Sequence, residues 1–333
     1  MSKEKIFAIL SAREGEFLSG EAISEQLGIS RAAVWKGVSA LRRDGYTIEA
    51  QTGLGYRLAA SPDALTEREV LRHLGATQAV GRTLYCFERV DSTNSFLKRA
   101  AAENAPDGAV AVADEQTAGR GRRGRSFSSG PGRGVYLSAL LRPKLPPERL
   151  LPLTALGAVA ACNAVERTCG VRPQIKWTND LVLNGKKLSG TLTELSLEGE
   201  TGTLDYAVIG IGINCGNARE DFPPELRETA TSIFLETGRR VCRAALAAAL
   251  IEELDRLYAA LQSGETADYL ALYRRDCLTL GREVRLLWRD ASERVTALDV
   301  DDQFGLIVRH EDGTVETVRT GEVSVRGLYG YVE

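Results

Sequence analysis

The chain has 333 residues, enough for two or three domains that each bury a core. Its formal net charge of -3 at pH 7 excludes a protein that is basic overall, so nucleic acid would need a local basic surface. The 6 cysteines and 2 histidines show no CxxC pair and no metal-site spacing. We find no signal peptide and no apolar run long enough for a membrane span. We therefore expect a soluble cytoplasmic protein that has no membrane partner.

The N-terminal segment predicts three short helices, at residues 3–12, 20–27 and 31–43. Ser30 stands where it can cap the third helix, which contains basic residues and no acidic one. A short turn between two helices, the second of them basic, is typical of helix-turn-helix domains that read the major groove. The residues that we expect to face DNA are Ser30, Arg31, Ala32, Trp35, Lys36, Ser39 and Arg42.

A predicted hairpin follows the third helix. Residues 46–50 and 56–58 have strand character and flank a glycine-containing turn at 51–55, which is typical of the wing beside the DNA backbone. A helical protein-interaction domain with a basic, solvated face is the alternative interpretation, and the wing favours DNA. Serine, proline and aspartate within residues 59–65 indicate a linker, so we place the first domain at residues 1–62.

Between residues 63 and 275, strands and helices alternate along the chain. We expect strands at 83–89, 109–113, 134–141, 174–177 and 206–214, and helices near 94–103, 151–167, 239–262 and 266–275. Gly210 and Gly212 in the last of these strands leave a groove where a ligand can approach the backbone. This pattern predicts a mixed, largely antiparallel sheet with helices behind it.

Residues 184–185, an Asn-Gly pair between two apolar runs, are typical of a two-residue hairpin turn. Such a turn pairs residue 182 with residue 187. Because side chains alternate by two along a strand, we expect Asp180, Lys187 and Ser189 to share one face.

Residues 276–333 show short alternating segments separated by glycine and aspartate turns. Strands are expected at 283–288, 295–300, 305–308, 314–318 and 323–325. This spacing predicts a C-terminal β-barrel of SH3-like size. The fold class is therefore α+β, with an N-terminal winged helix-turn-helix, a central mixed sheet with helices and a small β-barrel.

The most unusual stretch is the loop at residues 116–125, in which glycine and arginine alternate. Glycines let successive N–H groups point inward, and guanidinium groups match phosphate oxygens, so the composition suits an anion. The stretch also satisfies GxGxxG, but no helix and no acidic residue about 20 positions later follow it, which excludes a dinucleotide fold. A solvated loop or an RGG-like RNA-binding segment is the alternative. Apolar runs at 109–113 and 135–141 instead place the loop between two buried strands.

Three further polar clusters follow predicted strands, at residues 92–94, 176–180 and 186–187. Helix caps, turns and solvated lysines are their structural interpretations. Together the clusters supply donors for a polar head group, cations for phosphate and a carboxylate for Mg²⁺. Because neither histidine is near them, a reaction without a protein base is favoured, such as attack of a substrate carboxylate on the α-phosphate of ATP.

Four ordered motifs resemble the signature blocks of biotin protein ligases: GRGRRGR at 119–125, KWTND at 176–180, KLSGTL at 187–192 and GIGIN at 210–214. The preceding winged helix resembles that of the bifunctional members, which also repress biotin operons. Two positions depart from the family pattern, since Thr178 replaces a proline and Phe127 replaces a common tryptophan.

This resemblance implies a class II synthetase-like ligase domain that forms biotinyl-5'-AMP from biotin and ATP and transfers biotin to a lysine of a biotin carboxyl carrier protein. It implies Lys187, Arg122 and Lys176 as catalytic residues and Asp180 as a candidate Mg²⁺ ligand. The biotin and biotinyl-AMP residues would be Ser92, Thr93, Asn94, Gln116, Gly119, Arg120, Gly121, Arg122, Lys187, Gly190 and Asn214.

The resemblance also implies that biotinyl-5'-AMP is a corepressor, which promotes a homodimer that binds operator DNA. Two alternatives remain open on the sequence. The protein could be a repressor that senses a ligand without catalysis, or a related ligase for lipoate or another carboxylic acid.

Overall fold

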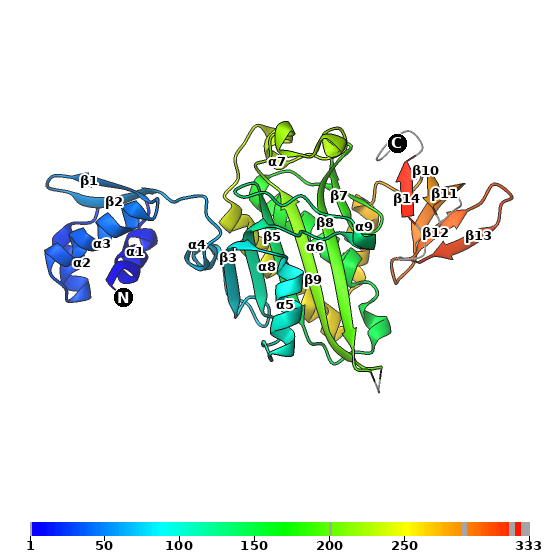
Figure 1. Cartoon of the computed structure of the whole chain (residues 1–333), viewed down its shortest axis with the longest axis horizontal. Coiled ribbons are helices and arrows are strands. Elements are labelled where there is room, and N and C mark those ends of the chain that lie inside the picture. The colour runs from blue at the N-terminus through cyan, green and yellow to red at the C-terminus, as the bar shows by residue number, and fades with distance from the viewer. Residues whose placement is uncertain (1, 200–201, 288–291, 320–323, 328–333) are drawn as a thin grey trace. The chain divides into compact units, whose positions relative to one another are not determined.

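The computed structural model describes residues 2–199, 202–287, 292–319 and 324–327 (Figure 1). By its internal contacts the chain divides into two compact units, Met1–Asp63 and Ala64–Glu333. Two residues that we expected in strands, Trp288 and Val323, lie outside the described residues.

The described part of the first unit contains three helices and a hairpin, as the sequence predicts. Their bounds are α1 Ser2–Ala12, α2 Gly20–Leu27, α3 Arg31–Arg43, β1 Thr47–Gln51 and β2 Gly55–Ala60.

Helix α3 begins at Arg31, directly after its predicted capping residue Ser30. The Ser30 side chain accepts a hydrogen bond from the backbone N–H of Ala33 at 3.2 Å, which satisfies one of the free donors of the first turn. The buried face of α3, with Val34 and Val38, packs against Ile6 of α1 in one hydrophobic cluster. The opposite face of the helix therefore stays exposed to solvent.

The centre of the second unit is a mixed sheet, which has seven strands among the described residues. The strand order is β3-β4-β5-β9-β8-β7-β6; β3 and β4 are parallel and the other neighbours are antiparallel. The strands are β3 Leu84–Val90, β4 Val110–Gln116, β5 Gly134–Leu141, β6 Gln174–Lys176, β7 Asp180–Leu183, β8 Lys186–Leu197 and β9 Leu204–Asn214.

Helices cover both faces of this sheet (Figure 1). On one face, α5 (Thr93–Ala102) packs on Ala111 of β4 and Val208 of β9. On the other face, α6 (Leu153–Cys169) and α8 (Arg243–Ser263) pack on the alternate residues of the same strands. The face that carries α5 also carries the candidate site. The remaining α-helices of the described residues are α4 Glu67–His73, α7 Ile233–Thr237 and α9 Ala267–Asp276, and none of the described helices is long and apolar enough to cross a membrane.

The hairpin of β7 and β8 has the predicted turn but not the predicted alternation. Val182 pairs with Lys187 as expected. The register then shifts between Val182 and Leu181, so Leu181 pairs with Ser189. Ser189 also pairs with Ile213, and both partners belong to the core cluster behind the sheet. Ser189 therefore shares the core face, and the expectation that it faces Asp180 and Lys187 was wrong.

The C-terminal strands form a second sheet, antiparallel and five-stranded within the described residues. Its order is β13-β12-β11-β10-β14, with β10 Glu283–Leu287, β11 Ser292–Val300, β12 Leu306–Arg309, β13 Val315–Val318 and β14 Ser324–Gly327. Trp177 Nε1 donates a hydrogen bond of 2.9 Å to the carbonyl of Phe304, which joins this sheet to the β6–β7 turn. The predicted α+β class is confirmed: N-terminal helices with a hairpin, a central mixed sheet with helices and a C-terminal antiparallel sheet.

Candidate functional site

A cavity of about 650 Å³ opens on the α5 face of the central sheet. Its walls come from the start of α5, the end of β4 and the loop at residues 116–125, called the arginine loop below. The β6–β7 turn, strands β8 and β9 and the segment 222–230 complete them. The sequence-predicted residues that line it are Ser92, Thr93, Asn94, Gln116, Arg120, Gly121, Arg122, Lys176, Asp180, Lys187, Gly190 and Asn214. Gly119 was also predicted, but it is not among the lining residues, although the next residue, Arg120, is.

Two glycines of β9 allow the neighbouring elements to approach the floor of the cavity. A Cβ at Gly210 would collide with the side-chain amide of Asn94, and one at Gly212 would lie 2.6 Å from the ring of Phe127. Any larger residue would therefore push α5, or the segment that carries Phe127, away from the sheet.

A hydrogen-bonded network of side chains forms the inner end of the cavity. Thr93 donates from its backbone N–H and its hydroxyl to Gln116 Oε1, at 2.9 and 3.1 Å. Gln116 Nε2 in turn donates to Ser129 Oγ at 3.0 Å. The fully buried Ser138 lies within hydrogen-bonding distance of both Thr93 and Asn94, at 2.7 and 2.6 Å. These contacts fix the orientation of the Gln116 amide before any ligand arrives.

Glu194 of β8 joins this network to the arginine loop. Its carboxylate accepts hydrogen bonds from Asn94 at 3.0 Å and Lys98 at 2.9 Å and lies 3.5 Å from Arg120. Burial disfavours the charge of Glu194, but these donors and the nearby cations outweigh burial and hold its pKa below the ordinary value. The carboxylate is therefore ionised at neutral pH and attracts Arg120 to the cavity.

The arginine loop is folded back on itself. Gly121 donates to the carbonyl of Arg125 at 2.7 Å, and Phe127 donates to the carbonyl of Gly119 at 2.9 Å. A Cβ at Gly119 would collide with the carbonyl of Phe127, which explains why glycine is needed there. The backbone of Gly121 and the side chains of Arg120 and Arg122 thus reach the cavity together.

Cationic groups gather at the other end of the cavity. Lys187 Nζ lies 2.7 Å from Asp180 Oδ1, and a Cβ at Gly190 would lie 3.3 Å from both of these atoms. Lys176 is 7% exposed and lines the same wall, after which the Trp177–Thr178 peptide bond is cis. This end of the cavity suits a phosphate group.

The site offers few ligands to a resident metal ion. Among the described residues no group of three or more His, Cys, Asp and Glu side chains could hold one. Asp180 is the sequence-predicted ligand, and its carboxylate is paired with Lys187. A single carboxylate fits a Mg²⁺ ion that arrives with a polyphosphate, whose oxygens supply most of the ligands.

The segment between β9 and α7 supplies a wall that the sequence did not suggest. Lys187 donates from its backbone N–H to Thr229 at 2.7 Å, and Thr231 donates to the Lys187 carbonyl at 2.8 Å. This pairing brings the apolar side chains of Phe222 and Leu226 to the cavity. Residues 215–231 carry no motif that we could identify in the sequence, and only their position beside β8 shows that they form this wall.

Asn214 stands between this wall and the floor. Its Nδ2 donates 3.0 Å to the carbonyl of Thr231, while its buried Oδ1 meets no donor within the described residues. Because a buried acceptor without a donor is costly, Oδ1 is suited to a ligand group that donates to it.

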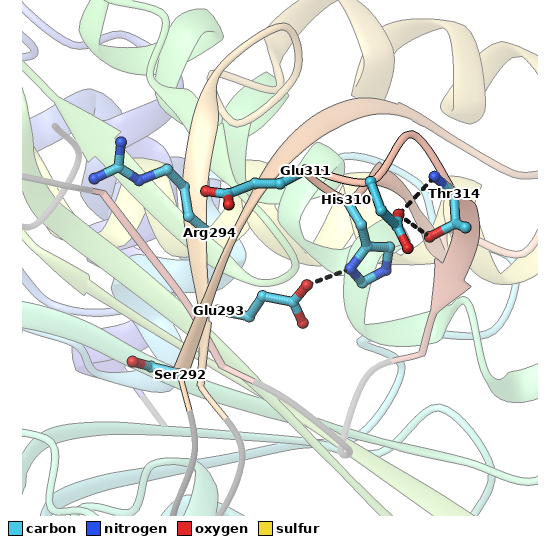
Figure 2. Close-up of a pocket in the computed structure, with 7 residues that line it drawn as sticks. Ser292, Glu293, Arg294, His310, Glu311 and Thr314 are labelled. Carbon is cyan, nitrogen blue, oxygen red and sulfur yellow. Dashed lines mark hydrogen bonds and ion pairs between the residues drawn. The ribbon is translucent and has the colours of Figure 1, made fainter.

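A second, more open hollow of about 450 Å³ lies on the C-terminal sheet. Figure 2 shows Glu293 pointing toward the ring of His310, with Nδ1 and Oε1 2.6 Å apart. His310 Nε2 also lies 3.2 Å from Glu316. Within this hollow His310 pairs with Glu293, and Thr314 pairs with Asp312. None of the sequence-predicted site residues lines it, so we place the candidate site in the central cavity.

On the first unit, the predicted DNA-facing residues lie on or cap α3. The Trp35 side chain is 58% exposed, and Arg31 and Lys36 are also exposed. Arg42 differs from them, because its Nε and one terminal nitrogen both donate to the carbonyl of Ile48, at 2.9 and 2.6 Å. Arg42 thereby joins α3 to the hairpin.

Comparison with known proteins decides the family. Residues 86–214 match the biotin/lipoate A/B protein ligase family, and residues 2–57 match an HTH domain. The chain is 35% identical to the bifunctional ligase/repressor BirA of Bacillus subtilis, over 93% of this chain and 95% of that protein. The chain belongs to the BirA family. It is therefore a biotin–[acetyl-CoA-carboxylase] ligase with the helix-turn-helix domain of a repressor, as the motifs predicted.

A second curated relative agrees with this chain in length, and a shorter solved structure agrees with it in fold. The chain is 31% identical to the Escherichia coli protein over 97% of this chain and 96% of that one. A solved biotin protein ligase of Aquifex aeolicus, in complex with biotin and ATP, has a TM-score of 0.63 and 29% identity, over 74% of this chain and 99% of that one.

Proposed function

We propose that this protein forms biotinyl-5'-AMP from biotin and ATP in the central cavity and transfers the biotinyl group to a lysine of a biotin carboxyl carrier protein. With the adenylate bound, it acts as a homodimer that represses the biotin operon. One observation carries the proposal: the polar network around Gln116 and the cationic end around Lys187 belong to one cavity. A cavity with these two ends suits a ligand that has a polar head group at one end and a phosphate group at the other.

The network around Thr93 and Gln116 would bind the ureido ring of biotin. That ring presents one carbonyl oxygen and two N–H groups, so it needs both donors and acceptors. Ser92, Thr93, Gln116 and the backbone of Arg120 offer both kinds of group at the cavity surface. The inner end therefore suits the ureido ring of biotin better than the dithiolane ring of lipoate, which has no N–H group and no carbonyl.

The cationic end would hold the reacting phosphate. A biotin carboxylate oxygen attacks the α-phosphorus of ATP, the bond to the β-phosphate oxygen breaks, and pyrophosphate leaves. Lys187, Arg122 and Lys176 neutralise the charge that develops on the phosphate oxygens. Mg²⁺, bound to the triphosphate, would add charge neutralisation, with Asp180 as its nearest protein carboxylate.

The second step needs only an entering amine. The carrier lysine nitrogen attacks the acyl carbon of the mixed anhydride, the bond from carbon to phosphate oxygen breaks, and AMP leaves as the nitrogen loses a proton to solvent. The protein contributes positioning, since the cavity holds the anhydride while the amine enters. Phe222 and Leu226 would provide an apolar wall for the adenine ring, with Asn214 Oδ1 as an acceptor beside it.

In this proposal residues 1–62 bind operator DNA, residues 63–275 form the ligase domain and residues 276–333 complete it. Both activities place the protein in the cytoplasm. Two copies of α3 in a homodimer would occupy paired half-sites, as dimeric helix-turn-helix proteins require.

The first experiment combines the protein with biotin, MgATP and a generic biotin carrier domain and records the intact mass of the carrier. We expect an ATP-dependent gain of one biotin. No gain, with biotin shown to bind, would leave a ligand-sensing repressor. A gain with lipoate in place of biotin would contradict the assignment of the inner pocket.

A further inference from the structure

Two loops that border the cavity are joined to each other outside it. The first is the glycine-rich stretch 128–134, which follows the arginine loop and carries Ser129, the partner of Gln116. The second is the segment 215–231, which carries Phe222 and Leu226. Arg133 is the residue of the first loop that contacts the second.

Arg133 makes four contacts with the second loop. Its Nε lies 3.1 Å from Asp221 Oδ2, and its Nη1 donates to the Gly216 carbonyl at 3.4 Å. The backbone carbonyl of Arg133 accepts hydrogen bonds from Cys215 and Gly216, at 2.9 and 2.8 Å. The two backbone contacts do not depend on the side chain, so the guanidinium adds the part of the junction that is specific to arginine.

Asp221 is placed to transmit this contact to the cavity. It immediately precedes Phe222, which is 2% exposed and lines the cavity. Its Oδ2 also accepts a hydrogen bond from the backbone N–H of Ala218 at 2.8 Å, so the carboxylate holds the short turn in shape. Moving Asp221 would therefore move Phe222.

We propose that Arg133 and Asp221 are positioning residues that hold the wall at 215–231 against the glycine-rich loop and so retain the bound adenylate until an amine arrives. The inference rests on the proposed function, because it names the adenylate as the retained molecule. Neither side chain lines the cavity. The pair therefore acts through Phe222 rather than on the reacting atoms.

The test uses the full-length protein preloaded with adenylate from biotin and ATP that carries ³²P in its α-phosphate, then diluted into excess unlabelled biotin and ATP. Arg133→Gln and Asp221→Asn each remove one charge, and the asparagine keeps an acceptor for Ala218. Because the pair is partly exposed, we expect each variant to release the label about threefold to tenfold faster. We expect the KM for ATP to rise with kcat nearly unchanged, and the double variant to release label no faster than the single variants.

The chain offers a matched control. Arg274 and Asp299 form a comparable pair: Nε lies 3.0 Å from Oδ1, a terminal nitrogen donates to the carbonyl of Val300, and Arg274 has the same 41% exposure as Arg133. Arg274→Gln should release adenylate at the wild-type rate. Equal release from wild type and the Arg133 and Asp221 variants, independent effects in the double variant, or equally fast release from Arg274→Gln would overturn the proposal.

Amide hydrogen exchange of the ligand-free protein separates this inference from the proposed function. Faster exchange across 215–231 in Arg133→Gln supports the junction whether or not adenylate forms, and unchanged exchange overturns it. If wild type forms no labelled adenylate, the proposed function fails, and the exchange result still decides whether the two loops are held by this pair.

Discussion

Single residues set the chemistry of the cavity through their neighbours. Gln116 is oriented by Thr93 and Ser129, and Lys187 is held beside Asp180. The residue types at these positions were predicted from motifs, whereas Ser129 was not among the predicted site residues. Short hydroxyl-bearing residues give no signal in a sequence until a fold brings them to a partner.

Lys187 is the residue whose loss should most affect the first step. In Lys187→Gln the cation at the reacting phosphate is lost, and we expect kcat/KM for adenylate formation to fall at least about 100-fold. Pyrophosphate release with biotin and ATP measures this step. Lys186→Gln is the matched control, because Lys186 does not line the cavity; an equal loss in both variants would show that general charge, not position, matters.

Gly210 should tolerate no side chain. In Gly210→Ala the new Cβ meets the Asn94 amide, so we expect weaker biotin binding and a loss of about 1–3 kcal/mol in the free energy of unfolding. Calorimetric titration with biotin and denaturant unfolding measure the two effects. Gly199→Ala, where no atom lies within 4 Å of the new Cβ, should change neither. Normal biotin binding by Gly210→Ala would contradict the contact.

At the scale of elements, strand pairing decided which predictions succeeded. The turn at 184–185 followed from two residues, and its pairing of 182 with 187 is confirmed. The register shift after it could not be read locally, because it depends on how β8 also pairs with β9. Another long-range pairing, between Lys187 and residues 229–231, brings that segment to the cavity, where it forms a wall.

His310 follows the last residue of β12 and links β11 to β13, because its partners Glu293 and Glu316 lie on these two strands. The hydrogen bond to Glu293, with the charges of both carboxylates, raises the pKa of His310 above its ordinary value of 6.5. A raised pKa means that the protonated ring stabilises the folded state. This contribution is fully present below pH 6.5 and is lost as the pH rises through the folded-state pKa.

The chain has 2 histidines, so an NMR titration can assign His310 with the His310→Gln variant. We expect its pKa to lie above 6.5 in the folded protein and to fall in Glu293→Gln, where the main partner loses its charge. Glu311→Gln, which alters a nearby acid without an assigned contact to the ring, serves as the control. A pKa at or below 6.5 in wild type would contradict the arrangement.

At the scale of the whole molecule, two compact units carry two kinds of chemistry. The first has an exposed basic helix, and the second has the cavity. This division allows substitutions in one unit to leave the other activity intact. The net charge of -3 makes the cations of α3 the candidates for phosphate contact.

Lys36→Ala should therefore weaken operator binding without changing carrier biotinylation. If Lys36 contacts a phosphate, the slope of log K against log salt should become shallower by about 0.9. Fluorescence anisotropy at several salt concentrations measures the slope. Lys5→Ala, an exposed lysine of α1, should leave it unchanged, and a change of equal size in both variants would assign the effect to net charge alone.

The sequence by itself determined the elements and motifs that depend on neighbouring residues. Ser30 caps α3 and the pair at 184–185 forms a hairpin turn, because both effects act between residues that are only a few positions apart in the sequence. Tertiary structure alone decided the side to which Ser189 points and the partners of Arg133 and Glu194. Those outcomes depend on strands and loops that are distant in sequence and meet only when the core packs, so no local pattern encodes them.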